Sequence, residues 1–381
     1  MKFDRAHLAY CTNIHPAESW EETRRALQVH VLRVRDLLRE QGRLAPGERF
    51  AIGLRLSARA AEELLRGDQL AAFRDWLAQE ESYVFTINGF PYGDFHGTRV
   101  KERVFQPDWC DPKRLAYTRN LFEILSQIAD PACGGSVSTL PGSHKTFNAD
   151  ESLIISHLRD FSQWLDALSE RSGIDLHLGL EPEPIGHFEN LHETIVFFDR
   201  LRDGASNLPA LTRRVGLNYD TCHFAIEFDS ARTSLEALQA ADIRLSKIHL
   251  SSALALDPRD PMALAAIRPF DEPTYFHQVI GRYPDGSLHR FIDLPYFLDA
   301  PPEDLEEARV HFHIPLDAEP AAPLRSTRRD VEEVLAWKRD HPEACRHYEI
   351  ETYTWGVLPG AMQRPVEEQI AGEYAWVLEH S

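Results

Sequence analysis

Short apolar runs alternate along the chain with longer stretches in which hydrophobic residues recur every three or four positions. Runs of four to eight residues rich in β-branched and aromatic side chains are typical of buried strands. Eight strands are predicted on this basis, over residues 8–14, 50–56, 82–90, 134–140, 176–182, 214–221, 245–251 and 346–355.

The three-to-four spacing predicts amphipathic helices between these strands. The stretch 19–42 also carries end signals, with Ser19 as a candidate N-cap, Glu22 three residues later and Gly42 at the end. The predicted helices span residues 19–42, 58–67, 112–129, 150–173, 190–202 and 330–341.

The alternation of strands and helices predicts an α/β fold with a parallel sheet, and eight strands are the number that closes a (β/α)8 TIM barrel. The competing architecture is a doubly wound open sheet. That sheet would need a glycine-rich turn after its first strand, and residues 12–20, TNIHPAESW, contain no glycine. We therefore expect one TIM-barrel domain over residues 1–381.

Residues 253–308 interrupt the alternation of predicted strands and helices, because they are rich in proline, aspartate and glycine. Two alternating segments flank Asp285-Gly286, and an Asp-Gly pair in that setting is typical of a β-hairpin. We expect a hairpin-containing insertion after the seventh strand, covering the C-terminal mouth of the barrel.

The composition limits the partners and the compartment. A formal charge of −19 disfavours nucleic acid as a partner, because neutralising phosphates needs clustered lysine and arginine. No run approaches the roughly 18 apolar residues of a membrane helix, so no membrane insertion is expected. Five scattered cysteines without a CxxC pair indicate reduced thiols and a cytoplasmic protein. The sequence leaves open whether the chain forms a homo-oligomer.

Four predicted strands end on residues that can bind a metal: Glu181, Asp220, His249 and Glu351. In a TIM barrel the carboxyl ends of the strands surround one pocket, so these side chains should converge. Carboxylates and an imidazole suit a divalent metal ion such as Mn, Zn, Co or Mg. The alternative for each residue alone is a solvated loop position.

Side chains alternate along a strand, so the residues two positions earlier should point inward one layer deeper. Two of these residues are Lys247 and Glu349, on strands expected to be neighbours. Neither charge is tolerable alone in the barrel interior. We expect a buried ion pair beneath the metal layer, and Lys247 could also assist substrate binding electrostatically.

Three further histidines indicate a second metal or a substrate contact. His223 follows Asp220 by three residues, and His311 and His313 form an HxH pair whose imidazoles should project to one side of an extended segment. Ordinary hydrogen bonding is the alternative for each. The remaining polar candidates for holding substrate hydroxyls are Asn88, His96 and His144, near predicted strand ends.

At these residues the chain resembles the xylose isomerase-like TIM-barrel superfamily, which includes sugar isomerases, sugar epimerases and endonuclease IV. The most specific string is Tyr219-Asp220-Thr221-Cys222-His223. Endonuclease IV carries a similar DTCH and similar LPGSH-like, HLND-like and DRH-like stretches. Here Leu140 stands where that enzyme has a zinc-binding histidine, and His311 replaces an aspartate ligand, so cleavage of DNA is not expected.

The whole sequence also resembles the metabolite traffic protein EboE family. The segments that carry this resemblance are the opening HLAYCTNIHPAESW, FPYGDFHG over 90–97 and the ending EIETYTWGVLP. That family is associated with operons that export or modify secondary metabolites. The resemblance implies the same barrel and the same site.

The resemblance to sugar isomerases implies that one divalent ion binds adjacent oxygens of a sugar, cyclitol or similar polyol and stabilises an enediolate. Glu181 and Glu351 would then be the catalytic residues that remove and return a proton. Two alternatives stay open. One is a metal-dependent hydrolase of the endonuclease IV type with two or three ions, and the other is a non-catalytic carrier in a metabolite pathway.

Overall fold

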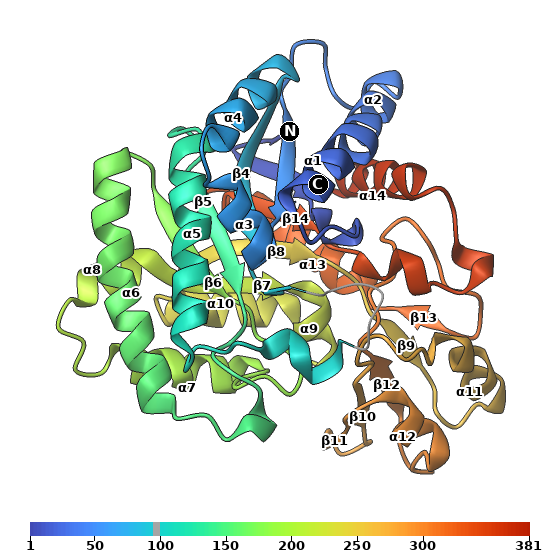
Figure 1. Cartoon of the computed structure of the whole chain (residues 1–381). Helices are drawn as coiled ribbons and strands as arrows, with labels where there is room; N and C mark the ends of the chain where they lie inside the picture. Colours follow the sequence, from blue (N-terminus) through green and yellow to red (C-terminus); the bar gives the residue numbers. More distant parts are fainter. Residues whose placement is uncertain (94–99) are drawn as a thin grey trace.

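Eight parallel strands form a closed barrel in the computed structural model, which describes residues 1–93 and 100–381 (Figure 1). The sheet runs in the order β2-β14-β8-β7-β6-β5-β4-β3, and a parallel bridge between Cys11 and Gly53 joins its two edges. The predicted (β/α)8 TIM barrel is therefore confirmed. Its strands are β2 (Ala6–Tyr10), β3 (Phe50–Arg55), β4 (Ser82–Asn88), β5 (Gly135–Thr139), β6 (Leu176–Leu180), β7 (Val215–Asp220), β8 (Leu245–Leu250) and β14 (His347–Ile350).

Two strand boundaries differ from the prediction. The first barrel strand lies at 6–10 and not at 8–14, because the chain turns into the 3-10 helix η1 (Thr12–Ile14). There the backbone nitrogen of Arg55 donates a hydrogen bond to the Thr12 hydroxyl at 2.8 Å, in place of the backbone carbonyl that would accept it in a continued strand. The last strand ends at Ile350, and the 3-10 helix η6 (Tyr353–Val357) follows.

Helices surround the barrel (Figure 1). The predicted capping box exists: Ser19 accepts from the Glu22 nitrogen, and the Glu22 carboxylate accepts from the Ser19 nitrogen at 2.8 Å. A π-helical turn over Leu27–Val31 divides the helix predicted at 19–42. The helices that follow strands are α1 (Trp20–Ala26), α2 (Leu32–Glu40), α3 (Ala58–Leu64), α4 (Gln69–Gln79), α5 (Pro112–Ile128), α6 (Glu151–Ser172), α7 (Leu191–Arg202), α8 (Leu208–Arg214), α9 (Thr221–Ile226), α10 (Ala231–Ala240), α13 (Arg328–Asp340) and α14 (Val366–His380).

The sequence prediction missed α4, α8, α9, α10 and α14. Gly372 lies within α14, and Pro209 near the start of α8 has the appearance of a turn residue in sequence. In the structure, tertiary packing outweighs these local signals. Among the described residues, no helix is both long enough and apolar enough to cross a membrane.

A second sheet lies between β8 and α13, to one side of the barrel (Figure 1). Its strands pair antiparallel in the order β11-β10-β12-β9-β13. A hairpin joins β10 and β11, with Gly286 at a positive φ of 85° in its turn. The inserted sheet extends past residue 308, because β12 and β13 belong to it. Its elements are β9 (Leu254–Leu256), α11 (Pro261–Ile267), β10 (Val279–Arg282), β11 (Leu288–Phe291), α12 (Leu294–Asp299), β12 (Glu307–Val310) and β13 (Arg325–Ser326).

Candidate metal centre

Three carboxylates surround one imidazole nitrogen at the carboxyl end of the barrel strands. Nδ1 of His249 lies 3.1 Å from Glu181 Oε1, 3.2 Å from Asp220 Oδ2 and 3.1 Å from Glu351 Oε2. Asp220 and His249 are fully buried, and Glu181 and Glu351 are at most 5% exposed. The structure therefore brings together all four residues predicted as ligands.

The hydrogen bonds of His249 show that this set fits a cation. Its Nε2 lies 2.9 Å from Glu349 Oε2 and donates its hydrogen there, which leaves the Nδ1 lone pair facing the three carboxylates. Burial lowers the pKa of His249, but the carboxylates of Glu351 and Glu181 outweigh it and raise the pKa well above 6.5. A proton and a metal ion therefore compete for Nδ1, and a divalent ion would neutralise more of the charge.

The predicted ion pair beneath this layer is also present. Lys247 Nζ lies 2.6 Å from Glu349 Oε2, and both side chains are almost completely buried. Lys247 also donates to Ser138 Oγ at 2.9 Å. Burial raises the pKa of Glu349, but Lys247 and His249 outweigh it and hold the pKa at about 2. Glu349 is therefore an anion that orients the His249 imidazole from the deeper layer.

The carboxylates of Glu351 and Glu181 have different surroundings. Glu351 Oε1 accepts from the amide nitrogens of Asn13, at 2.9 Å, and Asn88, at 3.1 Å. Glu181 Oε2 is buried and has no hydrogen-bond partner among the described residues. Oε1 of Glu351 is thus occupied by two amide donors, whereas Oε2 of Glu181 is open to a ligand.

The three additional histidines form a second cluster beside the first. Asp220, His223 and His313 place ligand atoms within 4.8 Å of one another. Each imidazole is oriented through Nδ1: His223 donates to the Pro182 carbonyl at 2.8 Å, and His313 donates to the Glu351 carbonyl at 3.0 Å.

His311 is oriented by a glutamine from the inserted segment. The Gln278 amide nitrogen donates to the Pro184 carbonyl at 3.3 Å, so its oxygen faces His311 Nδ1 at 2.7 Å and accepts from it. The Nε2 atoms of His311 and His313 then lie 3.3 Å apart, each with its lone pair directed toward the other. Two lone pairs at that distance repel each other unless a proton or a metal ion lies between them.

Glu183 adds an acidic group to this cluster. Its Oε2 lies 3.4 Å from His223 Nε2. Burial and the neighbouring carboxylates Glu181 and Asp220 raise the pKa of Glu183 to about 8, although His223 opposes the shift. Burial lowers the pKa of His223, and Asp220 and Glu183 outweigh it to give about 9.

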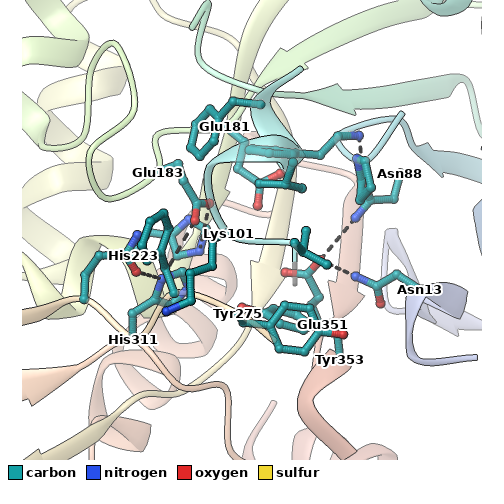
Figure 2. Close-up of a pocket in the computed structure, with 17 residues that line it drawn as sticks. Asn13, Asn88, Lys101, Glu181, Glu183, His223, Tyr275, His311, Glu351 and Tyr353 are labelled. Atoms are coloured by element: carbon teal, nitrogen blue, oxygen red, sulfur yellow. Dashed lines mark hydrogen bonds and ion pairs between the residues drawn. The ribbon is translucent and has the colours of Figure 1, made fainter. Parts of the chain in front are cut away.

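A cavity opens onto both clusters. Figure 2 shows Asn13 and Asn88 on one side of Glu351, and Glu183, His223 and His311 on the other. Tyr275 and Phe276, from the inserted segment, also line it. The described lining residues therefore come from the barrel and from the insertion.

The other predicted substrate contacts have different positions. Asn88 lines the cavity, whereas His144 packs its ring against Phe105 and is not among the described lining residues. Lys247 lies one layer deeper than the cavity. His96 falls outside the described residues. Leu140 is fully buried in the hydrophobic core and offers no ligand atom, as the comparison with endonuclease IV predicted.

Asn13, Gln278 and Glu183 were not predicted to be site residues. Asn13 lies in the 3-10 helix η1, a segment that the sequence predicted to be part of the first strand. Gln278 belongs to the inserted segment, whose placement depends on tertiary contacts. Glu183 stands two residues after Glu181, so the strand period of two already indicated that it faces the same side.

No protein-family model and no curated protein matches the chain. The resemblance to the EboE family therefore stays a prediction. Solved structures similar to the chain include a xylose isomerase domain containing protein from Salmonella typhimurium, with 12% identity, 99% of both chains covered and a TM-score of 0.43.

Two further solved structures are similar to the chain. A probable 3-DHS dehydratase, AsbF, from Bacillus anthracis has 10% identity, 97% of both chains covered and a TM-score of 0.44. D-psicose 3-epimerase from Clostridium cellulolyticum has 13% identity and a TM-score of 0.40, over 64% of this chain and 72% of that one. At these identities and TM-scores the similarities carry no inference about activity.

Proposed function

We propose that the protein is a divalent-metal-dependent isomerase or epimerase acting on a sugar, cyclitol or similar polyhydroxylated molecule. The observation that supports this most is the convergence of three carboxylates on His249 Nδ1, at 3.1 to 3.2 Å. Glu181, Asp220, His249 and Glu351 would hold the ion. When bound there, a divalent ion would act as a Lewis acid toward adjacent substrate oxygens and favour an enediolate.

The two glutamates take separate roles in this proposal. Glu181 Oε2, which is buried and has no partner among the described residues, would accept the proton from the substrate carbon. Glu351, whose Oε1 accepts hydrogen bonds from Asn13 and Asn88, would return a proton to the substrate. The inserted segment, with Tyr275 and Phe276 on the cavity wall, would exclude water from the site.

Metal analysis combined with deuterium exchange tests this proposal. Purified protein loaded with Mn²⁺ is incubated in D2O with a panel of ketoses and cyclitol ketones, and NMR follows loss of the C–H signal next to the carbonyl. We expect exchange by the loaded protein and loss of exchange in Glu181→Gln, with metal content measured in parallel. Glu343→Gln, at an exposed glutamate paired with Arg5, is the control. Exchange that persists in both Glu181→Gln and Glu351→Gln contradicts the assignment.

The histidine cluster favours a second candidate, a metal-dependent hydrolase with two ions. Asp220 belongs to both ligand groups, and His223 and His313 complete the second. Paired ions of this kind activate water and stabilise a leaving oxygen. Two metal equivalents per chain that fall to one in His313→Ala, together with hydrolysis of a phosphodiester or ester, would favour this candidate. One equivalent in the unmodified protein would exclude it.

A further inference from the structure

We propose that the substrate carries an apolar body, an aryl or alkyl group, attached to the polar head that meets the metal centre. This inference rests on the proposed function, because it places the oxygen-bearing end of the substrate at Glu181 and Glu351. The observation behind it is a division of the cavity. Its polar side chains gather around the two ligand clusters, whereas much of its remaining described wall is hydrocarbon. The apolar wall residues are Phe90, Val100, Val104, Phe105, Tyr275 and Phe276.

The apolar wall is built from segments far apart in sequence. Phe90 follows β4, and Val104 and Phe105 belong to the 3-10 helix η3 (Lys101–Phe105). Tyr275 and Phe276 come from the inserted segment. The Phe90 and Phe105 rings meet edge to face, with centroids 5.4 Å apart. The wall therefore exists in the protein without a ligand.

The polar lining groups are largely occupied by other protein groups. The amide nitrogens of Asn13 and Asn88 donate to Glu351, and the Asn13 Oδ1 beside them is a buried acceptor without a partner among the described residues, close to the ligand clusters. Gln278 bonds to His311 and to the Pro184 carbonyl. Lys101 is paired with Asp293 and lies over the Phe276 ring, 5.1 Å from its centroid. Few described groups therefore remain to bind hydroxyls on the part of a substrate distant from the ligand clusters.

Desolvation then decides between two kinds of substrate. A hydroxyl that loses water against Val104 or Phe276 costs free energy unless it finds a hydrogen bond. A hydrocarbon group in the same place gains free energy in proportion to the apolar area it buries. Aromatic rings alone could also stack on a sugar face, but Val104 offers no ring.

Two hydroxyketones with the same head test this inference. Hydroxyacetone and 2-hydroxyacetophenone both present a hydroxyl next to a ketone, and they differ in carrying a methyl or a phenyl group. Isothermal calorimetry measures the binding of each to the Mn²⁺-loaded full-length protein. We expect the phenyl ligand to bind at least about tenfold more tightly, because the ring adds apolar area to the contact. Equal affinities, or no binding by either ligand, would overturn the inference.

A matched pair of variants locates the preference. Phe276 is half-buried, so its replacement should leave the fold intact, and thermal unfolding and metal content check this for each variant. Phe276→Ser should reduce the preference for the phenyl ligand at least about threefold, whereas Phe276→Leu should retain most of it. An unchanged preference in Phe276→Ser would place the phenyl group elsewhere and overturn the inference.

Deuterium exchange into the same two ligands separates this inference from the proposed function. A phenyl preference without exchange supports the apolar body and removes the isomerase reaction. Exchange with equal affinities supports the reaction and overturns the apolar body.

Discussion

Glu349 Oε2 accepts hydrogen bonds from both His249 Nε2, at 2.9 Å, and Lys247 Nζ, at 2.6 Å. One carboxylate oxygen thus connects the imidazole of His249, a candidate metal ligand, to a buried lysine. The contact fixes the His249 tautomer and directs Nδ1 toward Glu181, Asp220 and Glu351. The deeper layer of the barrel therefore sets the orientation of a candidate ligand in the upper layer.

Glu349→Gln should weaken metal binding about 10- to 100-fold, because the neutral amide oxygen makes the His249 imidazole a poorer ligand. Competition with a metallochromic chelator measures this affinity for Mn²⁺ or Zn²⁺. Glu343→Gln, at an exposed glutamate paired with Arg5, is the control and should leave the affinity unchanged. An affinity of Glu349→Gln equal to that of the unmodified protein would show that Glu349 has no influence on the metal centre.

Lys247→Met should lower the free energy of unfolding by about 3–5 kcal/mol, because it leaves a buried carboxylate without its cation. Urea denaturation of the metal-free protein measures the change. The double variant Lys247→Met/Glu349→Gln should lose less than the sum of the two single changes, since neither partner then remains charged and unpaired. Strict additivity would contradict a direct interaction between these side chains.

Gly53→Ala should be strongly destabilising. A Cβ at this position would overlap Glu349 Oε1 and lie 2.5 Å from the Tyr10 carbonyl oxygen, where the first and second barrel strands meet. Overpacking of this kind costs about 1–3 kcal/mol or more. Gly356→Ala is the matched control, because no atom lies within 4 Å of its added Cβ. Thermal unfolding should show a marked fall for the first variant and little change for the second.

Much of the candidate metal centre is predictable because its residues follow from the positions of strand ends and from the alternation of side chains along each strand. Glu181, Asp220, His249 and Glu351 each end a strand, and the period of two along β8 and β14 places Lys247 and Glu349 beneath them. The barrel itself requires that the ends of its strands converge. Neither inference needs a contact between unpredicted loops.

The rest of the site depends on contacts that local patterns do not encode. Gln278 reaches His311 because β10 pairs with β12 in the inserted sheet, which places the two residues opposite each other, and no local periodicity fixes that register. Asn13 binds Glu351, 338 positions away in the chain, from a turn that the sequence favours as a strand. The substrate contact expected for His144 stays a prediction: its ring packs against Phe105, which lines the cavity.

Low pH should reduce the folding stability of the inserted segment through protonation of Glu272. The hydrogen bonds of its carboxylate determine the direction of this effect. Its carboxylate accepts from His277 Nε2, at 2.9 Å, and from the backbone nitrogens of Thr274 and Tyr275, at 2.8 and 2.9 Å. Burial raises the pKa of Glu272, but these donors outweigh it and lower the pKa from 4.5 to about 2. The stabilisation is therefore present above pH 4.5 and is lost as the pH falls toward 2.

The variant Glu272→Gln isolates this contribution, because it cannot titrate. Between pH 5 and pH 2.5 its free energy of unfolding, measured by urea denaturation, should fall less steeply than that of the unmodified protein. Glu303→Gln, at an exposed carboxylate of the same inserted segment, should keep the steeper dependence. Identical slopes for Glu272→Gln and the unmodified protein would mean that Glu272 is protonated equally in the folded and unfolded states. The hydrogen bonds that place Tyr275 at the cavity wall would then not depend on its charge.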